Sequence, residues 1–179
     1  MTFRRSFDRR GWWMLAGALG VASLGGIAAG AAAVTATNPF AQHAAQAGIK
    51  QCATVFPALG GLLTQGATYS VETKWNTKSP DAHAVQGLVG MAYDGAAYKG
   101  KAVGVVYATP AVGGCAGQMV RVAPFPKSCA EVTKTLPTGT VLAKSLSDTP
   151  LFNLGGGGGQ AMLLPAGQNC VVVSIASLG

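Results

Sequence analysis

The stretch Ala102–Ala108, with the sequence AVGVVYA, decides the fold that we predict. Its residues are apolar almost throughout, which favours a central strand of a sheet. The preceding stretch Gln86–Tyr93 is a second strand candidate, and Asp94–Lys101 between the two contains the glycine of a turn. The sequence therefore predicts a sheet in which residues 102–108 form a central strand.

Helix and strand signals lie on both sides of this centre. Tyr69–Asn76 alternates apolar and polar side chains, as a half-buried strand does. Asn38 and Pro39 form a helix start, after which apolar residues, Cys52 among them, recur at helical spacing as far as Leu59. The remaining candidates are a capping box at Ser128–Glu131 that predicts a helix through Leu136, and strands at Gln118–Ala123, Thr140–Ser145, Leu151–Leu154, Gln160–Leu164 and Asn169–Ala176.

Together these elements predict an α+β fold, with one N-terminal helix packed on a mainly antiparallel sheet of five or more strands. A profilin-like or PAS-like layout would fit this order of elements, by analogy alone. A chain of 179 residues suits one domain with a leader attached. We therefore predict a leader at residues 1–36 and a single disulfide-bonded domain at residues 37–179.

The leader has the three parts of an export signal. Met1–Arg10 carries four arginines, residues 12–34 are uncharged and long enough to span a bilayer, and small residues precede a cleavage point after Ala36. The run Arg4–Phe7 resembles the core of a twin-arginine signal, although the export route stays open. If the segment is not cleaved, residues 12–34 would anchor the chain in the inner membrane with its N-terminus in the cytoplasm. Both alternatives place residue 37 onward outside the cytoplasm, in the periplasm or beyond the cell.

The formal net charge of +7 suggests an anionic partner, but the distribution of the basic residues along the chain argues against nucleic acid. Four of the 13 basic residues lie in the first ten positions, and those that remain are mostly single, scattered lysines. Proteins that bind nucleic acids cluster such charges on one face. We therefore expect no nucleic-acid partner, and membrane contact only through residues 12–34 if the leader is retained.

All four cysteines follow the leader, and their even number predicts two disulfides in an oxidising compartment. An extended strand at residues 118–123 would hold Cys115 and Cys129 too far apart to bond. We therefore predict the pairs Cys52–Cys129 and Cys115–Cys170. Because no C-x-x-C spacing is present, we predict no metal site.

Few residues suggest a catalytic or ligand-binding role. Gly155–Gly159 lacks the Lys-Ser/Thr of a phosphate-binding loop and is predicted to be a flexible hairpin loop. Asp81 and His83 form a weak acid–base or metal candidate on a loop, and His43 is predicted to lie on the surface. Cys129, at a helix N-terminus beside Lys127, would make a reactive thiolate if it were free. The aromatic residues that could line a ligand face are Trp75, Tyr93, Tyr98 and Tyr107.

These observations favour an exported protein of a bacterial envelope that acts as a non-enzymatic binding, assembly or structural module. One alternative is a small periplasmic thiol or hydrolytic enzyme with Cys129 as its nucleophile. The other is a membrane-tethered subunit of an envelope complex. No catalytic residue, cofactor or metal is predicted, and the partner is an unidentified envelope protein or ligand.

Overall fold

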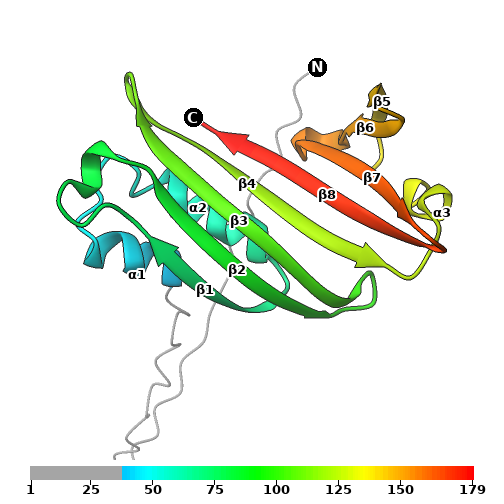
Figure 1. Ribbon diagram of the computed structural model, residues 1–179, viewed down its shortest axis with the longest axis horizontal. Helices are drawn as coiled ribbons and strands as arrows, with labels where there is room; N and C mark the ends of the chain where they lie inside the picture. The colour runs from blue at the N-terminus through cyan, green and yellow to red at the C-terminus, as the bar shows by residue number, and fades with distance from the viewer. Residues whose placement is uncertain (1–37) are drawn as a thin grey trace, which may run out of the picture. The chain divides into compact units, whose positions relative to one another are not determined.

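The computed structural model describes residues 38–179, in which eight strands form one antiparallel sheet (Figure 1). The helices are α1 (Pro39–Gln46), α2 (Val55–Thr64) and α3 (Cys129–Thr133), with short 3-10 turns η1 (Pro80–Ala82) and η2 (Gly155–Gly157). In their order across the sheet, the strands are β1 (Thr68–Lys74), β2 (Val85–Asp94), β3 (Lys99–Ala111), β4 (Gly114–Phe125), β8 (Asn169–Leu178), β7 (Gln160–Ala166), β6 (Thr149–Asn153) and β5 (Val141–Leu146).

The predicted α+β fold class is wrong, because strands account for 49% of the structure and the three helices are short. The single helix expected from Phe40 to Leu59 is divided in two. Gly48, with φ of +73°, ends α1, and α2 begins only at Val55. The sheet also differs from a profilin-like or PAS-like layout. Strands β1 to β4 lie side by side in chain order, β4 then pairs with β8, and β7, β6 and β5 follow across the sheet in reverse chain order.

One face of the sheet is covered by α1 and α2, which lie behind the strands in Figure 1. Asn38 caps α1 as expected, since its side chain accepts a hydrogen bond from the Phe40 N–H at 2.9 Å. The Phe40 ring is fully buried, and it occupies the space that a side chain at Gly60 would need. The core between these helices and the sheet also contains Phe56, Leu59, Leu63, Val85, Val89, Met91 and Val106.

A smaller core lies beneath α3. The capping box is confirmed: Ser128 and Glu131 exchange hydrogen bonds, and those from Ser128 hold the pKa of Glu131 below its ordinary value. The buried side chains of this cluster are Val132, Ala161, Leu163, Cys170 and Val172. Helix α3 thus covers the same face as α2, over β7 and β8.

All four cysteines are disulfide-bonded, but the predicted pairing is wrong. The bonds are Cys52–Cys115 and Cys129–Cys170. The error comes from the register of β4 and β8, in which Phe125 lies opposite Cys170. Cys115 therefore lies ten residues away along β4, roughly 33 Å from Cys170 in an extended strand. The prediction that Cys52 faces the core is confirmed, since its side chain is 1% exposed.

Two disulfides in one domain of this size indicate an extracytoplasmic, oxidising compartment. Within residues 38–179, no helix has the length and apolar character needed to cross a bilayer. The predicted signal peptide or anchor at residues 1–36 and its cleavage point at Ala36 lie outside the described residues.

Candidate functional site

The second face of the sheet carries no helix or loop of the described chain. Side chains alternate between the two faces, so that in β3 the buried Ala102, Gly104 and Val106 face the helices and Val103 and Val105 face the other way. Val103 is 59% exposed, an unusual position for an apolar residue in the middle of an interior strand. We call this surface the open face.

Strand register arranges the side chains of the open face in two rows across the sheet. The first row contains Ser70, Gly90, Val103, Val122, Val173 and Met162 on six neighbouring strands. The second contains Glu72, Leu88, Val105, Val120, Ile175 and Gln160 on the same strands. Cross-strand neighbours lie about 4.5–5.5 Å apart, so the valines, leucine, isoleucine and methionine form a continuous apolar patch.

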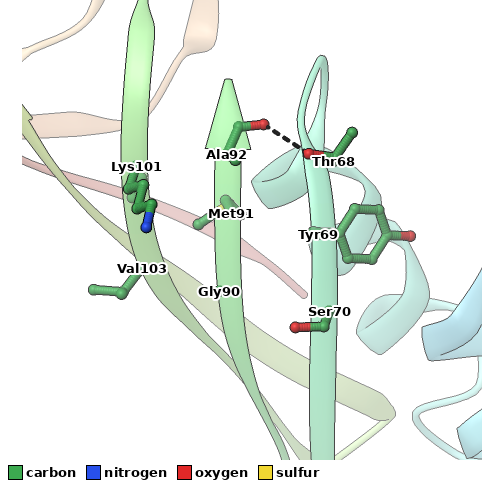
Figure 2. Close-up of a pocket in the computed structure, with 9 residues that line it drawn as sticks. Thr68, Tyr69, Ser70, Gly90, Met91, Ala92, Lys101 and Val103 are labelled. Atoms are coloured by element: carbon green, nitrogen blue, oxygen red, sulfur yellow. Dashed lines mark hydrogen bonds between the residues drawn. The ribbon is translucent and has the colours of Figure 1, made fainter. Parts of the chain in front are cut away.

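The patch is hollowed at Gly90, which leaves a gap in the first row (Figure 2). Figure 2 shows Gly90 without a side chain between Ser70 on β1 and Val103 on β3. The resulting depression is shallow, has a volume of about 530 Å³ and continues into a second one of about 410 Å³ that reaches Val120 and Val122. Val103 protrudes beside the depression at Gly90, so this face offers both a projection and a recess for packing against another surface.

Polar side chains border the patch. Glu72 and Lys74 form an exposed ion pair at 3.3 Å on the edge strand β1, and Lys101 lies near the start of β3. Gln118 and Ser177 are hydrogen-bonded to each other at 3.3 Å at the other end of the central strands. An apolar centre with a polar rim is the usual composition of a protein interface.

The structure does not bring the predicted aromatic ligand face together. Tyr107 lies on the open face and is 45% exposed, whereas Trp75 packs against the helix-side core. Tyr93 and Tyr98 are in edge contact on the helix side, with ring centroids 5.3 Å apart. Burial, with a smaller contribution from Tyr93, raises the pKa of Tyr98, and the Arg121 charge opposes this. Its hydroxyl donates to the carbonyl oxygens of Lys101 and Pro124, which is a structural role.

Asp81 and His83, the acid–base candidate, make contacts with different partners. Asp81 accepts hydrogen bonds from the backbone N–H groups of Lys50 and Gln51 at 2.9 and 2.7 Å, and His83 Nδ1 lies 3.0 Å from the Ser79 carbonyl oxygen. His43 is half-buried rather than on the surface, with Nδ1 2.8 Å from Thr73 Oγ1. Residues 38–179 contain no cluster of three potential metal ligands.

Asp81 has a testable effect on the pH dependence of stability. The hydrogen bonds from Gln51 and Lys50 lower its pKa in the folded state. Its contribution is therefore present above the unfolded pKa of about 3.9 and is lost as the pH falls through the lower folded value. We expect the urea midpoint of the wild type to exceed that of Asp81→Asn at pH 6, and the difference to shrink below about pH 4.

The control for this prediction is Asp148→Asn, which removes an exposed carboxylate in the turn between β5 and β6. An Asp81→Asn protein whose midpoint follows the wild type at every pH would contradict the role given to these two hydrogen bonds.

Cys129 loses the chemistry considered for it, and the glycine run forms the loop of a hairpin, as predicted. Cys129 is bonded to Cys170, so its sulfur is not available as a thiolate nucleophile. Gly155–Gly159 forms η2 and the connection to β7, in which Leu154 N–H donates to the Gly159 carbonyl oxygen at 2.8 Å. The loop is therefore a closed turn between β6 and β7.

Our sequence reasoning did not identify the open face, although two signals for it were present. The apolar run of β3 and the run Val171–Val173 in β8 both lack the alternation of a strand with one solvated face. We interpreted the apolar run of β3 only as the sign of a central strand.

Comparisons of this chain with protein-family models, with curated proteins and with solved structures find no match.

Proposed function

We propose that this protein is an exported, non-enzymatic assembly module of the bacterial envelope, and that a second copy of the same chain packs on its open face. The observation that carries the proposal is the uncovered row of valines at the centre of the sheet. Continuous exposed apolar patches on soluble proteins commonly mark interaction sites.

The extent of the open face matches the needs of a dimer. Six strands about 4.8 Å apart, each contributing about eight residues, cover roughly 29 Å by 27 Å, or about 780 Å², of which the two apolar rows form the centre and polar residues such as Glu72 and Lys101 the rim. Each partner in a stable protein complex contributes about 800 Å². A partner that covered only one depression of the face would leave much of the apolar surface in water.

Charge also favours a second copy. The apolar rows carry no charged side chain between Leu88 and Met162, so two open faces can meet without burying an unpaired charge. Two antiparallel sheets pack face to face at about 10 Å when their inner side chains are apolar, as in a sandwich. The paired sheets would then have helices on both outer sides, and β3 would be covered on both faces.

Export is supported by the basic and apolar leader and by the two disulfides. The periplasm and the extracellular space both fit, and retention of residues 12–34 would instead tether the domain to the inner membrane. N-terminal sequencing of the protein recovered from cells separates these alternatives, because removal of the leader would give a chain that starts at Thr37.

The test is sedimentation equilibrium of the wild type and of Val103→Asp. Val103 is exposed in the monomer, so the substitution leaves the fold intact but places a carboxylate at the centre of the interface. We expect a dimer for the wild type and a dissociation constant raised at least about tenfold by Val103→Asp. The matched control is Val112→Asp in the turn between β3 and β4, where the side chain is fully exposed and off the face.

Gly90→Val provides a second variant without added charge. A Cβ at Gly90 would have only the Ser70 hydroxyl nearby, at 4.0 Å, so the first atom of a side chain there enters open space in the monomer. The substitution is expected to weaken the dimer while the monomer stays folded. A wild type that remains monomeric, or a dimer that Val103→Asp and Val112→Asp weaken equally, would overturn the proposal.

A further inference from the structure

A cleft on the helix-covered face carries polar groups that the assembly surface does not use. It has a volume of about 320 Å³, and it is lined by the end of α2, by β4 and β8, and by the glycine turn η2. A smaller cavity of about 110 Å³ adjoins it beside Tyr93 and Tyr98. Arg121 and Ser174 line both cavities.

Arg121 is a half-buried cation without a carboxylate partner among residues 38–179. Its one side-chain hydrogen bond runs from Nη1 to the hydroxyl oxygen of Tyr93, at 3.3 Å. The carboxylates of the described chain are engaged elsewhere or exposed: Glu72 with Lys74, Asp94 with Lys99, Asp81 with backbone N–H groups, Glu131 with Ser128, and Asp148 in a turn. A guanidinium held partly out of water is stabilised by an anion, and the described chain supplies none.

Ser174 provides a second, independent observation. The residue is 8% exposed and lines both cavities. Among residues 38–179 no fully buried side-chain oxygen lacks a hydrogen-bond partner, so the Ser174 hydroxyl, which is not hydrogen-bonded to another described side chain, is reached by solvent through the cleft. In the register of β4 and β8 it lies directly opposite Arg121. A guanidinium and a free hydroxyl on neighbouring strands therefore converge on the same space.

Glycines of η2 form one wall of this space. On the side of the turn, Gly156 and Gly157 adopt φ of +66° and +72°, a region that side chains disfavour. Gln65 adds a neutral polar residue to the lining, and the large apolar residues that line the cleft are Leu62, Met119 and Leu154.

We propose that this cleft binds a small organic anion, a molecule with one carboxylate or phosphate group on a short apolar body. The Arg121 guanidinium pairs with the anionic group, the Ser174 hydroxyl donates a hydrogen bond to it, and the apolar side chains contact the body of the ligand. The cleft volume lies at the lower end of the usual range for small-molecule sites, which limits the ligand to a small molecule. The site lies on the face opposite the dimer surface and does not depend on the proposed assembly.

The test is titration calorimetry of the full-length protein with four probes. Octanoate and octyl phosphate carry both features of the proposed ligand, inorganic phosphate has the charge alone, and 1-octanol has the apolar body alone. We expect saturable binding of at least one octyl anion, and weaker binding of the two partial probes. The stronger of the two anions assigns the carboxylate or the phosphate as the preferred group. Failure of both octyl anions to bind would overturn the proposal.

Variants locate the binding. Arg121→Gln is expected to raise the dissociation constant about 10- to 100-fold, and Ser174→Ala by a smaller factor, because each removes one hydrogen-bonding group. The matched control is Lys101→Gln, which removes one positive charge from the open face. Binding that survives Arg121→Gln, or that Lys101→Gln abolishes, would place the anion outside the cleft and contradict the inference. Since Ser174→Ala leaves Arg121 in place, it keeps the test valid if Arg121→Gln fails to fold.

Discussion

Replacing Cys52 and Cys115 together by alanine is expected to lower the free energy of unfolding by about 4 kcal/mol. The bond joins residues 63 apart in sequence, and the closure of so long a loop removes much conformational freedom from the unfolded chain. It also ties the connection between α1 and α2 to the start of β4, so its loss frees the helices that cover the sheet. A domain of this size has about 5–15 kcal/mol in total, so the variant would lose between about a quarter and about four-fifths of its stability.

The measurement is urea unfolding followed by circular dichroism under non-reducing conditions. Cys129→Ala with Cys170→Ala is the comparison, since that bond has a sequence separation of 41 and an expected effect of similar size. A loss below about 1 kcal/mol for the Cys52 and Cys115 variant would show that this bond does not constrain the chain as described.

Phe40→Ala is expected to cost about 3–5 kcal/mol of stability, the usual range for removal of a fully buried ring. The ring makes an edge contact with Phe56, at 5.5 Å between centroids, and stacks on Tyr69 at 6.0 Å. It also fills the space above Gly60 and Gly87, which carry no side chains that could close the cavity left behind. The variant therefore loses both apolar burial and close packing.

The same urea measurement tests this prediction, with Val112→Ala as the control at a fully exposed position. The control is expected to change stability by less than about 0.5 kcal/mol. A Phe40→Ala protein as stable as the control would mean that α1 does not pack on the sheet through this ring.

Local signals predicted individual elements better than they predicted the fold. The capping box at Ser128, the helix cap at Asn38 and the interior position of residues 102–108 all follow from short-range patterns, and the structure confirms them. The helix from Phe40 to Leu59 failed because the apolar spacing continues through Gly48, where a positive φ ends α1.

Long-range pairing could not be predicted in this way. The position of β8 beside β4 depends on contacts between segments about fifty residues apart, and no local pattern specifies them. That pairing sets both the disulfide connectivity and the alignment of Arg121 with Ser174. For this reason the cysteine pairs were assigned wrongly and the cleft was not predicted. The sequence shows the cysteines, Arg121 and Ser174, but not which of them lie side by side.

The two proposed sites lie on opposite faces of one sheet. The open face contains the outward residues of β1, β2, β3, β4, β8 and β7, and the cleft contains inward residues of β4 and β8. Since alternate residues of the same strands serve each site, Val120 and Val122 can pack on a partner while Arg121 between them binds an anion. Loss of one function by substitution is therefore expected to leave the other intact.

The most direct test of the account is an isotope-filtered NOE experiment on a mixture of labelled and unlabelled protein. If a second copy packs on the open face, the methyl groups of Val103, Val105, Val122 and Ile175 will show intermolecular NOEs to the same set of residues. Intermolecular NOEs confined to other surfaces, or none in a protein that sediments as a monomer, would contradict it.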